Sequence, residues 1–305
     1  MPLAAEDMLG RFDQPPADRR QAVDPVLADA DDGQPPVPCA IFPTHTRPPE
    51  RMTLDLLLLG GTTEGRRLAA HVAGDPRFRA TLSLAGRTTD PLPQALPTRF
   101  GGFGGAQGLS RYIADNGIDA LVVATHPFAA RIAAGAAAAA AETGVPALQW
   151  LRPLWRREPG DDWHFHDSLE SLADALGQAP RRVFLTIGRQ EAHVFERAPQ
   201  HDYLVRSIEP IAPPLGLPKV DLVLARGPFD VDSEIALMRA HGTEIVVAKA
   251  SGGAATHAKI EAARRLGLPV HMVSRPPPSG LPTVGALADV LGWLDQLAGG
   301  AARGE

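Results

Sequence analysis

Short apolar segments alternate with segments of helical pattern along nearly the whole chain after residue 52, and this alternation constrains the fold more than any other feature. In the first half, the strand-like segments are LDLLLLG (54–60), RATLSLAG (79–86), IDALVVATHPFA (118–129) and VPALQWLR (145–152). Helix-forming segments lie between them, including an alanine-rich run that ends at Glu142. Strands that alternate with helices predict a parallel sheet covered on both faces.

The second half repeats this layout. Its strand-like segments are RRVFLTIGRQEA (181–192), DYLVRSI (202–208), VDLVLARGPF (220–229), TEIVVAKASGG (243–253) and LPVHMVSRP (268–276). We therefore predict an α/β fold of two doubly wound (Rossmann-like) parallel-sheet lobes with a cleft between them. The expected division is a cofactor-binding lobe over 52–165, a substrate-binding lobe over 166–280, and a C-terminal helix and tail over 281–305, with the helix at Thr283–Leu297.

Residues 1–51 differ from the rest of the chain. They carry ten of the thirty prolines and no periodic apolar pattern, which predicts a disordered extension. Met52 stands directly before the first strand, where a natural start would lie. The one cysteine, Cys39, excludes an intrachain disulfide, and a cytoplasmic location is the default expectation. No apolar run is long enough to span a membrane, and the formal net charge of −5 argues against nucleic acid as the main partner.

The segment LLLLGGTTEG (57–66) predicts a strand, a tight glycine turn and a helix opened by Glu64. A helix N-terminus presents free N–H groups and partial positive charge to an anion such as a phosphate. The glycine spacing differs from G-x-G-x-x-G, so a plain strand-to-helix turn is the alternative. Ligands of open parallel sheets bind beyond the carboxyl ends of the strands. The candidate cofactor-binding residues at those ends are Gly60, Gly61, Thr62, Thr63, Glu64, Arg87, Thr88, Gly101, Gly102, Phe103, Gly104, Thr125, His126 and Pro127.

Two of these residues have distinct alternatives. Arg87 follows the second strand, where a nucleotide fold meets the adenosine ribose. Arginine at that position accommodates the 2′-phosphate of NADPH, although NADH stays possible and a solvated surface arginine is the alternative. For His126, the alternative is a structural turn in which the imidazole bonds the backbone.

The strand ends of the second half are basic at nearly every position. The candidate substrate-binding residues there are Arg189, Arg206, Arg226, Gly227, Pro228, Phe229, Lys249, Ser251, Gly252, Gly253 and Arg275, of which Lys249 and Ser251 are also candidate catalytic residues. Lys249 is one of three lysines in the chain, with Lys219 and Lys259. It either clamps a substrate carboxylate or donates a proton, and a structural ion pair is the alternative.

Several chemistries are excluded or disfavoured. The tyrosines Tyr112 and Tyr203 have no lysine four places on, so the Tyr-x-x-x-Lys pair of short-chain dehydrogenases is absent. Neither a Walker loop nor a G-x-S-x-G elbow occurs. WHFH (163–166) spaces two histidines by two, but no further Cys/His cluster completes a metal site, so we predict none.

Ten motifs together resemble the precorrin-6A reductase family, in the order found there, from about Leu54 to Pro277. They are LLGGTTEGRRLA, SLAGRT, GGFGG, ATHPFAARI, LRPLW, IGRQE, ARGPFDVDSE, KASGG, K-x-x-A-A-R-x-L-G-[LI]-P-V and SRPP. The chain departs from the family at Ala250, where an acidic residue or asparagine is common, and at Gly65, where alanine is common.

The resemblance implies reduction of precorrin-6A in cobalamin biosynthesis, with NADPH as hydride donor. The macrocycle would gain a hydride at carbon 19 and a proton at the neighbouring carbon 18. The polycarboxylate tetrapyrrole would suit the basic strand ends, because charge-assisted Arg–carboxylate bonds are strong. Two alternatives stay open: an NADH-dependent reductase of cobalt-precorrin-6A, and a non-catalytic nucleotide-binding sensor. The oligomeric state is left open.

Overall fold

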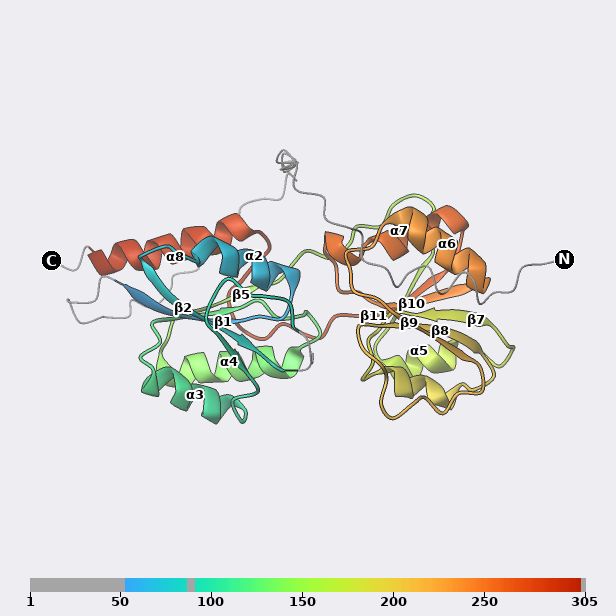
Figure 1. The fold of residues 1–305 in the computed structure, drawn as a ribbon, viewed down its shortest axis with the longest axis horizontal. Helices are drawn as coiled ribbons and strands as arrows, with labels where there is room; N and C mark the ends of the chain where they lie inside the picture. The colour runs from blue at the N-terminus through green and yellow to red at the C-terminus, as the bar shows by residue number, and fades with distance from the viewer. Residues whose placement is uncertain (1–52, 87–90, 303–305) are drawn as a thin grey trace. The chain divides into compact units, whose positions relative to one another are not determined.

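The computed structural model describes residues 53–86 and 91–302, and within them two parallel sheets carry the helices (Figure 1). The first sheet has the order β12-β5-β4-β1-β2-β3, and the second has the order β6-β11-β10-β7-β8-β9. All neighbouring strands pair in parallel. The predicted class, two parallel-sheet α/β lobes, is confirmed. The predicted N-terminal extension lies outside the described residues.

The first lobe is built around β1, whose side chains are buried on both faces of the sheet. Leu56 and Leu58 pack in one cluster with α2 and α8, whereas Leu57 and Leu59 pack in another with α3 and α4. This two-sided burial explains why the strand is apolar without interruption. The elements of this lobe are β1 (Leu54–Leu59), α2 (Thr63–Val72), β2 (Phe78–Leu84), β3 (Thr98–Phe100), α3 (Ala106–Asp115), β4 (Ala120–Val123), α4 (Ala130–Thr143), β5 (Ala147–Trp150), β12 (Thr283–Val284) and α8 (Leu287–Ala302).

The second lobe follows the same plan around β7. Phe184 packs in a cluster with α6 and α7, and Val183 and Leu185 pack on the other face with α5 and the 3₁₀ helix η2. The elements of this lobe are β6 (Trp163–His166), α5 (Leu169–Ala175), β7 (Arg182–Leu185), η2 (Ala192–Arg197), β8 (Asp202–Ser207), β9 (Val220–Leu224), α6 (Val231–His241), β10 (Ile245–Lys249), the 3₁₀ helix η3 (Ala254–Thr256), α7 (Ala258–Leu266) and β11 (Val270–Val273).

One edge strand of each sheet comes from a part of the chain that chain order would assign to the other sheet. Strand β6 follows β5 in the chain, yet it pairs with β11 in the second sheet, and β12 follows β11 but pairs with β5 in the first sheet. The division expected at residues 165/166 therefore runs through β6. Trp163 shows the reason, since it is buried in the cluster that also holds Met272 of β11.

The C-terminal segment likewise belongs to the first lobe instead of standing apart. The helix expected over Thr283–Leu297 begins later, at Leu287, because Thr283 and Val284 form β12 against Gln149 and Trp150. Helix α8 then places Val290, Trp293 and Leu294 in the core of the first lobe.

Each sheet has a point where the strand order reverses. In the first sheet this point lies between β1 and β4, and in the second it lies between β7 and β10. Loops that leave neighbouring strands in opposite directions open a crevice at such a point, and ligands of doubly wound sheets bind there. We therefore expect the candidate site at the loops that follow β1, β4, β7 and β10.

Candidate active site

The turn after β1 is held by Thr62, the N-cap of α2. Its hydroxyl donates to the carbonyl oxygen of Ala124 at 2.7 Å and accepts from the Gly65 N–H at 3.1 Å. Gly61 adopts a φ of +113°, and apart from its two chain neighbours no described residue has an atom within 4 Å of where a Cβ would stand. The turn therefore presents open backbone beside a helix N-terminus, as a phosphate site requires.

The loop after β4 contributes two buried polar groups. The hydroxyl of Thr125 is buried and has no hydrogen-bond partner among the described residues. The Nδ1 atom of His126 accepts the Phe128 N–H at 3.2 Å. Burial, followed by the charges of Arg152 and Lys249, lowers the pKa of His126 to about 3. With Nδ1 accepting, the neutral ring carries its proton on Nε2, so His126 is a neutral hydrogen-bond donor.

The glycine-rich loop between β3 and α3 is held by an arginine that the sequence analysis did not single out. The guanidinium of Arg99 lies over the Phe103 ring at 3.8 Å from its centroid. It also donates to Ser83 Oγ at 2.7 Å and to the carbonyl oxygen of Gly101 at 3.1 Å. The candidate residues Gly101, Phe103 and their neighbours are thus fixed beside the end of β2. The other candidates there, Arg87 and Thr88, lie outside the described residues.

The loop after β10 carries Lys249 to Gly253. Gly252 has a φ of +65°, and a Cβ on it would stand 1.9 Å from the carbonyl oxygen of Pro153, so the position requires glycine. The guanidinium of Arg275 donates to the carbonyl oxygens of Ala250 at 3.0 Å and of Ser251 at 2.7 Å. The structure thus uses Arg275 to hold this loop.

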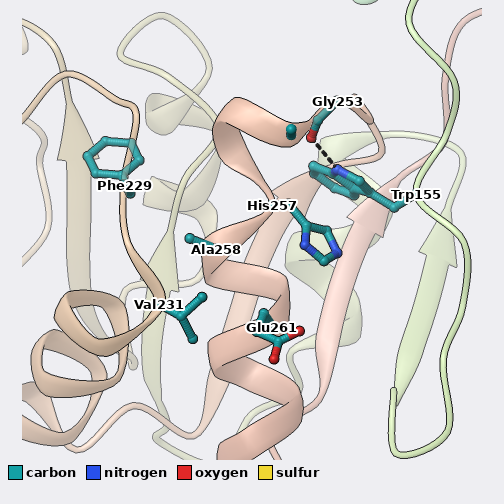
Figure 2. Close-up of a pocket in the computed structure, with 8 residues that line it drawn as sticks. Trp155, Phe229, Val231, Gly253, His257, Ala258 and Glu261 are labelled. Atoms are coloured by element: carbon teal, nitrogen blue, oxygen red, sulfur yellow. Dashed lines mark hydrogen bonds between the residues drawn. The ribbon is translucent and has the colours of Figure 1, made fainter. Parts of the chain in front are cut away.

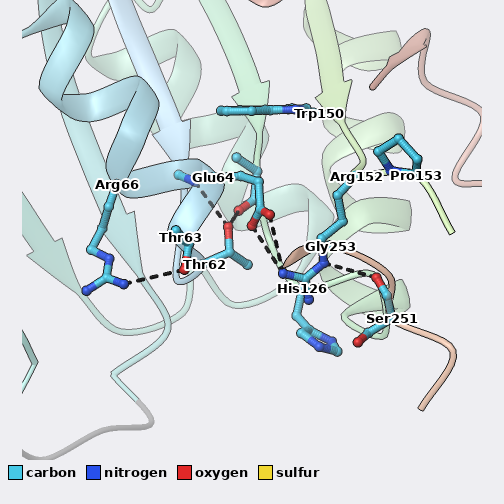
Figure 3. Close-up of polar contacts among 12 residues, drawn as sticks. Thr62, Thr63, Glu64, Arg66, His126, Trp150, Arg152, Pro153, Ser251 and Gly253 are labelled. Atoms are coloured by element: carbon cyan, nitrogen blue, oxygen red, sulfur yellow. Dashed lines mark hydrogen bonds and ion pairs between the residues drawn. The ribbon is translucent and has the colours of Figure 1, made fainter. Parts of the chain in front are cut away.

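A second arginine missed at the sequence level joins the two loops (Figure 3). Arg152 follows β5 and is 8% exposed. Its Nε donates to the carbonyl oxygen of Ser251 at 3.0 Å, and its Nη1 lies 3.2 Å from Glu64 Oε2 at the start of α2. One buried guanidinium therefore links the turn after β1 to the loop after β10. The motif LRPLW contains Arg152, but its spacing alone does not reveal these partners.

Most cations expected at the second set of strand ends have protein partners. Lys249 Nζ lies 2.6 Å from Glu191 Oε1 and 5.3 Å from the centroid of the Phe128 ring. Arg189 pairs with Glu209 at 2.6 Å. The ion pair that sequence reasoning left as the alternative for Lys249 is thus present.

Arg206 also has protein partners. It is buried in an ion pair with Glu234 of α6, and its guanidinium lies 3.7 Å from the centroid of the Phe229 ring. Arg226 is exposed in the loop after β9.

A cavity of about 420 Å³ gathers several candidate residues. Its lining includes His126 and Phe128 from the β4 loop, residues 186–191 after β7, and Lys249 and Ser251 after β10. The cavity also reaches Lys259 of α7, which sequence reasoning had noted only as one of three lysines and as part of a family motif. The loops after β4, β7 and β10 therefore line one cavity, and Arg152 links the turn after β1 to the loop after β10.

A second cavity of about 430 Å³ lies between the loop after β9 and the start of α7 (Figure 2). Trp155, Phe229 and His257 are among its lining residues, and the indole of Trp155 donates to the carbonyl oxygen of Gly253 at 2.7 Å. Of the candidate residues, Phe229 and Gly253 line this second cavity and not the cavity that contains Lys249. Gly227 and Pro228 precede Phe229 in the same loop.

The residues of the first lobe fit a dinucleotide. The open backbone at Gly61, the capped N-terminus of α2 and the unpartnered Thr125 hydroxyl supply donors and space for a pyrophosphate and its sugars. Metal chemistry has less support: the described part of the chain holds no group of three or more His, Cys, Asp or Glu side chains suited to a metal ion. The same residues include no helix long and apolar enough to cross a bilayer.

Known proteins match this chain over the region that builds the two lobes. The family model described as "Precorrin-6x reductase CbiJ/CobK" matches residues 55–295. The chain belongs to the precorrin-6A reductase family. The precorrin-6A reductase of a Sinorhizobium species is 53% identical over 243 residues, which are 78% of this chain and 93% of that protein. The precorrin-6A reductase of Rhodobacter capsulatus is 48% identical over 78% of this chain and 95% of its own.

A solved structure of the precorrin-6A reductase family supports the fold as well. It is that of a "CobK precorrin-6A reductase", at 46% identity and a TM-score of 0.77, and it covers 80% of this chain and 97% of its own. The resemblance drawn from the ten motifs is therefore confirmed. Reductases of this family use a reduced nicotinamide cofactor, which agrees with the dinucleotide fit of the first lobe.

Proposed function

We propose that this protein reduces precorrin-6A with NADPH, adding a hydride to one carbon of the macrocycle and a proton to its neighbour. The observation that carries the proposal is the cavity beside Lys249 and His126, which Arg152 connects to the dinucleotide turn after β1. Loops linked in this way can position part of a macrocycle beside a nicotinamide, and such positioning accounts for much of the rate in cofactor enzymes.

In this proposal the first lobe holds the cofactor. Gly60 to Glu64 would receive the pyrophosphate at the N-terminus of α2, and Thr125 would donate its free hydroxyl to a ribose or phosphate oxygen. The loop 101–104 would border the adenosine side, with Arg87 on the 2′-phosphate. When bound, reduced nicotinamide supplies the hydride. His126 would orient an acceptor on cofactor or substrate through its Nε2–H, and its low pKa keeps it from acting as an acid.

The second lobe would hold the substrate carboxylates. Lys249 and Arg189 line the cavity, but each is already paired with a glutamate. A substrate carboxylate therefore binds by sharing or replacing Glu191 at Lys249, which makes binding depend on displacement of a partly exposed side chain. Ser251 would add a hydroxyl, and Gly252 and Gly253 would keep the loop in shape. Arg206 and Arg275 would act on this site indirectly. Arg206 is bound to Glu234, and Arg275 holds the loop after β10 through its carbonyl oxygens.

The test is anaerobic incubation of the protein with precorrin-6A and either NADPH or NADH, following the absorbance of the reduced nicotinamide. Consumption with NADPH in preference to NADH supports the proposal. Turnover only of cobalt-precorrin-6A with NADH would favour the alternative reductase. Nicotinamide binding without consumption of either substrate would favour a nucleotide sensor. Identities of 53% and 48% to enzymes named for the cobalt-free substrate support the first outcome.

Substitutions at Lys249 test the carboxylate clamp. Lys249→Arg keeps a cation and is expected to retain most turnover, whereas Lys249→Ala should raise KM by about 10- to 100-fold, the range of a charged hydrogen bond. Lys219→Ala, at an exposed lysine, is the matched control and should leave both constants unchanged. An unchanged KM in Lys249→Ala would show that Lys249 is a structural partner of Glu191 alone.

We also propose a cytoplasmic location, in keeping with the single cysteine of the sequence.

A further inference from the structure

Lys259 is a buried lysine at the edge of the active-site cavity. It lies on the first turn of α7, is 5% exposed and lines the cavity together with Lys249 and His126. The Nζ atom donates to the carbonyl oxygen of Thr256 at 2.7 Å and lies 5.2 Å from the centroid of the Trp155 ring. Among the described residues, no carboxylate forms an ion pair with it, in contrast to Lys249.

The charges around Lys259 come from three other elements. Arg206 of β8 and Arg152 after β5 oppose a positive charge on Lys259, while Glu234 of α6 favours it. Glu234 is already bound to Arg206, so its negative charge stabilises the Lys259 ammonium only in part. Burial first, and then Arg206, lower the pKa of Lys259 to about 7. An ammonium group in this position loses its proton far more readily than a lysine in water.

Three other nitrogen-bearing side chains that line the cavity are poor proton donors. His126 is neutral with its Nδ1 occupied, and the ammonium of Lys249 is held by Glu191 at 2.6 Å. The guanidinium of Arg189 does not deprotonate in proteins. Beside Lys259, the Thr256 hydroxyl is buried and has no partner among the described residues, so a polar ligand group can be received there.

We propose that Lys259 is the proton donor of the reduction. This rests on the proposed function and deepens it. The substrate double bond receives a hydride from the reduced nicotinamide on one carbon and a proton from the Lys259 ammonium on the other. The C=C bond becomes CH–CH, the nicotinamide leaves oxidised, and Lys259 becomes a neutral amine that regains a proton from solvent. Lys249 then serves as the clamp and Lys259 as the acid.

The chain offers a direct measurement that does not depend on turnover. With three lysines in the sequence, NMR of protein labelled at lysine gives three side-chain signals, assigned with Lys219→Arg, Lys249→Arg and Lys259→Arg. The Lys259 signal should titrate near neutral pH, and that of exposed Lys219 near its usual pKa of about 10.4. A Lys259 signal that titrates together with Lys219 would overturn the proposal.

The second measurement is the pH profile of kcat with precorrin-6A and NADPH. An acid must be protonated, so wild-type kcat should fall as pH rises past the titration of Lys259 in the complex, and Lys249→Arg should keep that fall. Lys259→Arg keeps the charge but cannot release a proton, so kcat should drop by about 100-fold or more with nicotinamide affinity preserved. Lys259→Met should lose kcat likewise, and Lys219→Met should not.

The outcomes separate the two proposals. If wild type turns over but its kcat does not fall with rising pH, or Lys259→Arg retains kcat and the same profile, Lys259 is not the donor and the reductase function stands. If wild type reduces neither substrate with either nicotinamide, the proposed function fails, and the donor role fails with it. Because the wild-type titration and profile are decisive alone, the result does not depend on the folding of a variant.

Discussion

At the scale of single residues, the chemistry of the candidate site depends on partners that are distant in sequence. The sequence placed cations at the ends of the second-lobe strands, and they lie there. It did not reveal that Glu234 pairs with Arg206 or that Glu191 pairs with Lys249, because these partners are 28 and 58 residues away. A strand end can be recognised locally, whereas the charge that reaches a ligand depends on tertiary pairing.

His126 gives a prediction about pH. Its pKa falls from 6.5 to about 3, so between these values the unfolded chain binds a proton that the folded protein does not. The free energy of unfolding therefore decreases as pH falls from 6.5 towards 3. His126→Asn keeps an acceptor for the Phe128 N–H but cannot titrate. From pH 7 to 4.5, urea unfolding should show about 2–3 kcal/mol less loss of stability in the variant than in wild type. Equal losses in both proteins would mean that the imidazole is not buried as a neutral ring.

At the scale of elements, local pattern predicted most of the strands and helices. The runs of β1, β4, β7 and β10 are apolar and end in glycine, threonine or a cation, so both their type and their end were readable. β12 was missed because a two-residue strand has no periodicity of its own, and its pairing with β5 determines it. The start of α8 was displaced for the same reason.

The turn after β1 gives the prediction at this scale. Gly61 and Gly74 both have positive φ, at +113° and +79°, and in the described part of the chain only their sequence neighbours lie within 4 Å of a Cβ at either site. Alanine at each should cost a similar strain, about 1 kcal/mol. Gly61→Ala should in addition weaken NADPH binding by about tenfold or more, because the methyl group occupies the space where a phosphate approaches the backbone. Calorimetric titration with NADPH measures the affinity of both variants. Equal affinities of the two variants would place the pyrophosphate elsewhere.

At the scale of the whole molecule, the lobes are connected in a way that no local signal encodes. Each sheet takes its sixth strand from the segment next to the other lobe, since β6 joins β11 and β12 joins β5. The lobe boundaries predicted from the sequence assume that each lobe is one continuous segment. An edge strand can instead pair with the sheet of the other lobe, and chain order does not show this. Arg152 adds a second link through Glu64 and Ser251. A cut at any single position between the lobes would therefore leave one sheet without its edge strand.

The ends of the chain should consequently respond in opposite ways to removal. The family model begins at residue 55, and the relatives at 53% and 48% identity are matched over 93% and 95% of their own length by less than four-fifths of this chain. A chain beginning at Met52 is therefore expected to keep the thermal midpoint and the turnover of the full protein.

A chain ending at Gly285 loses α8, and with it Val290, Trp293 and Leu294 from the first core. Burial of such side chains contributes about 1.5–3 kcal/mol each, so this chain should fail to unfold cooperatively on heating and lose NADPH binding. Scanning calorimetry and nicotinamide binding on both chains give the comparison. A large loss in the Met52 chain would show that the first 51 residues are part of the folded enzyme, and an intact transition without α8 would show that the first lobe does not need its C-terminal helix.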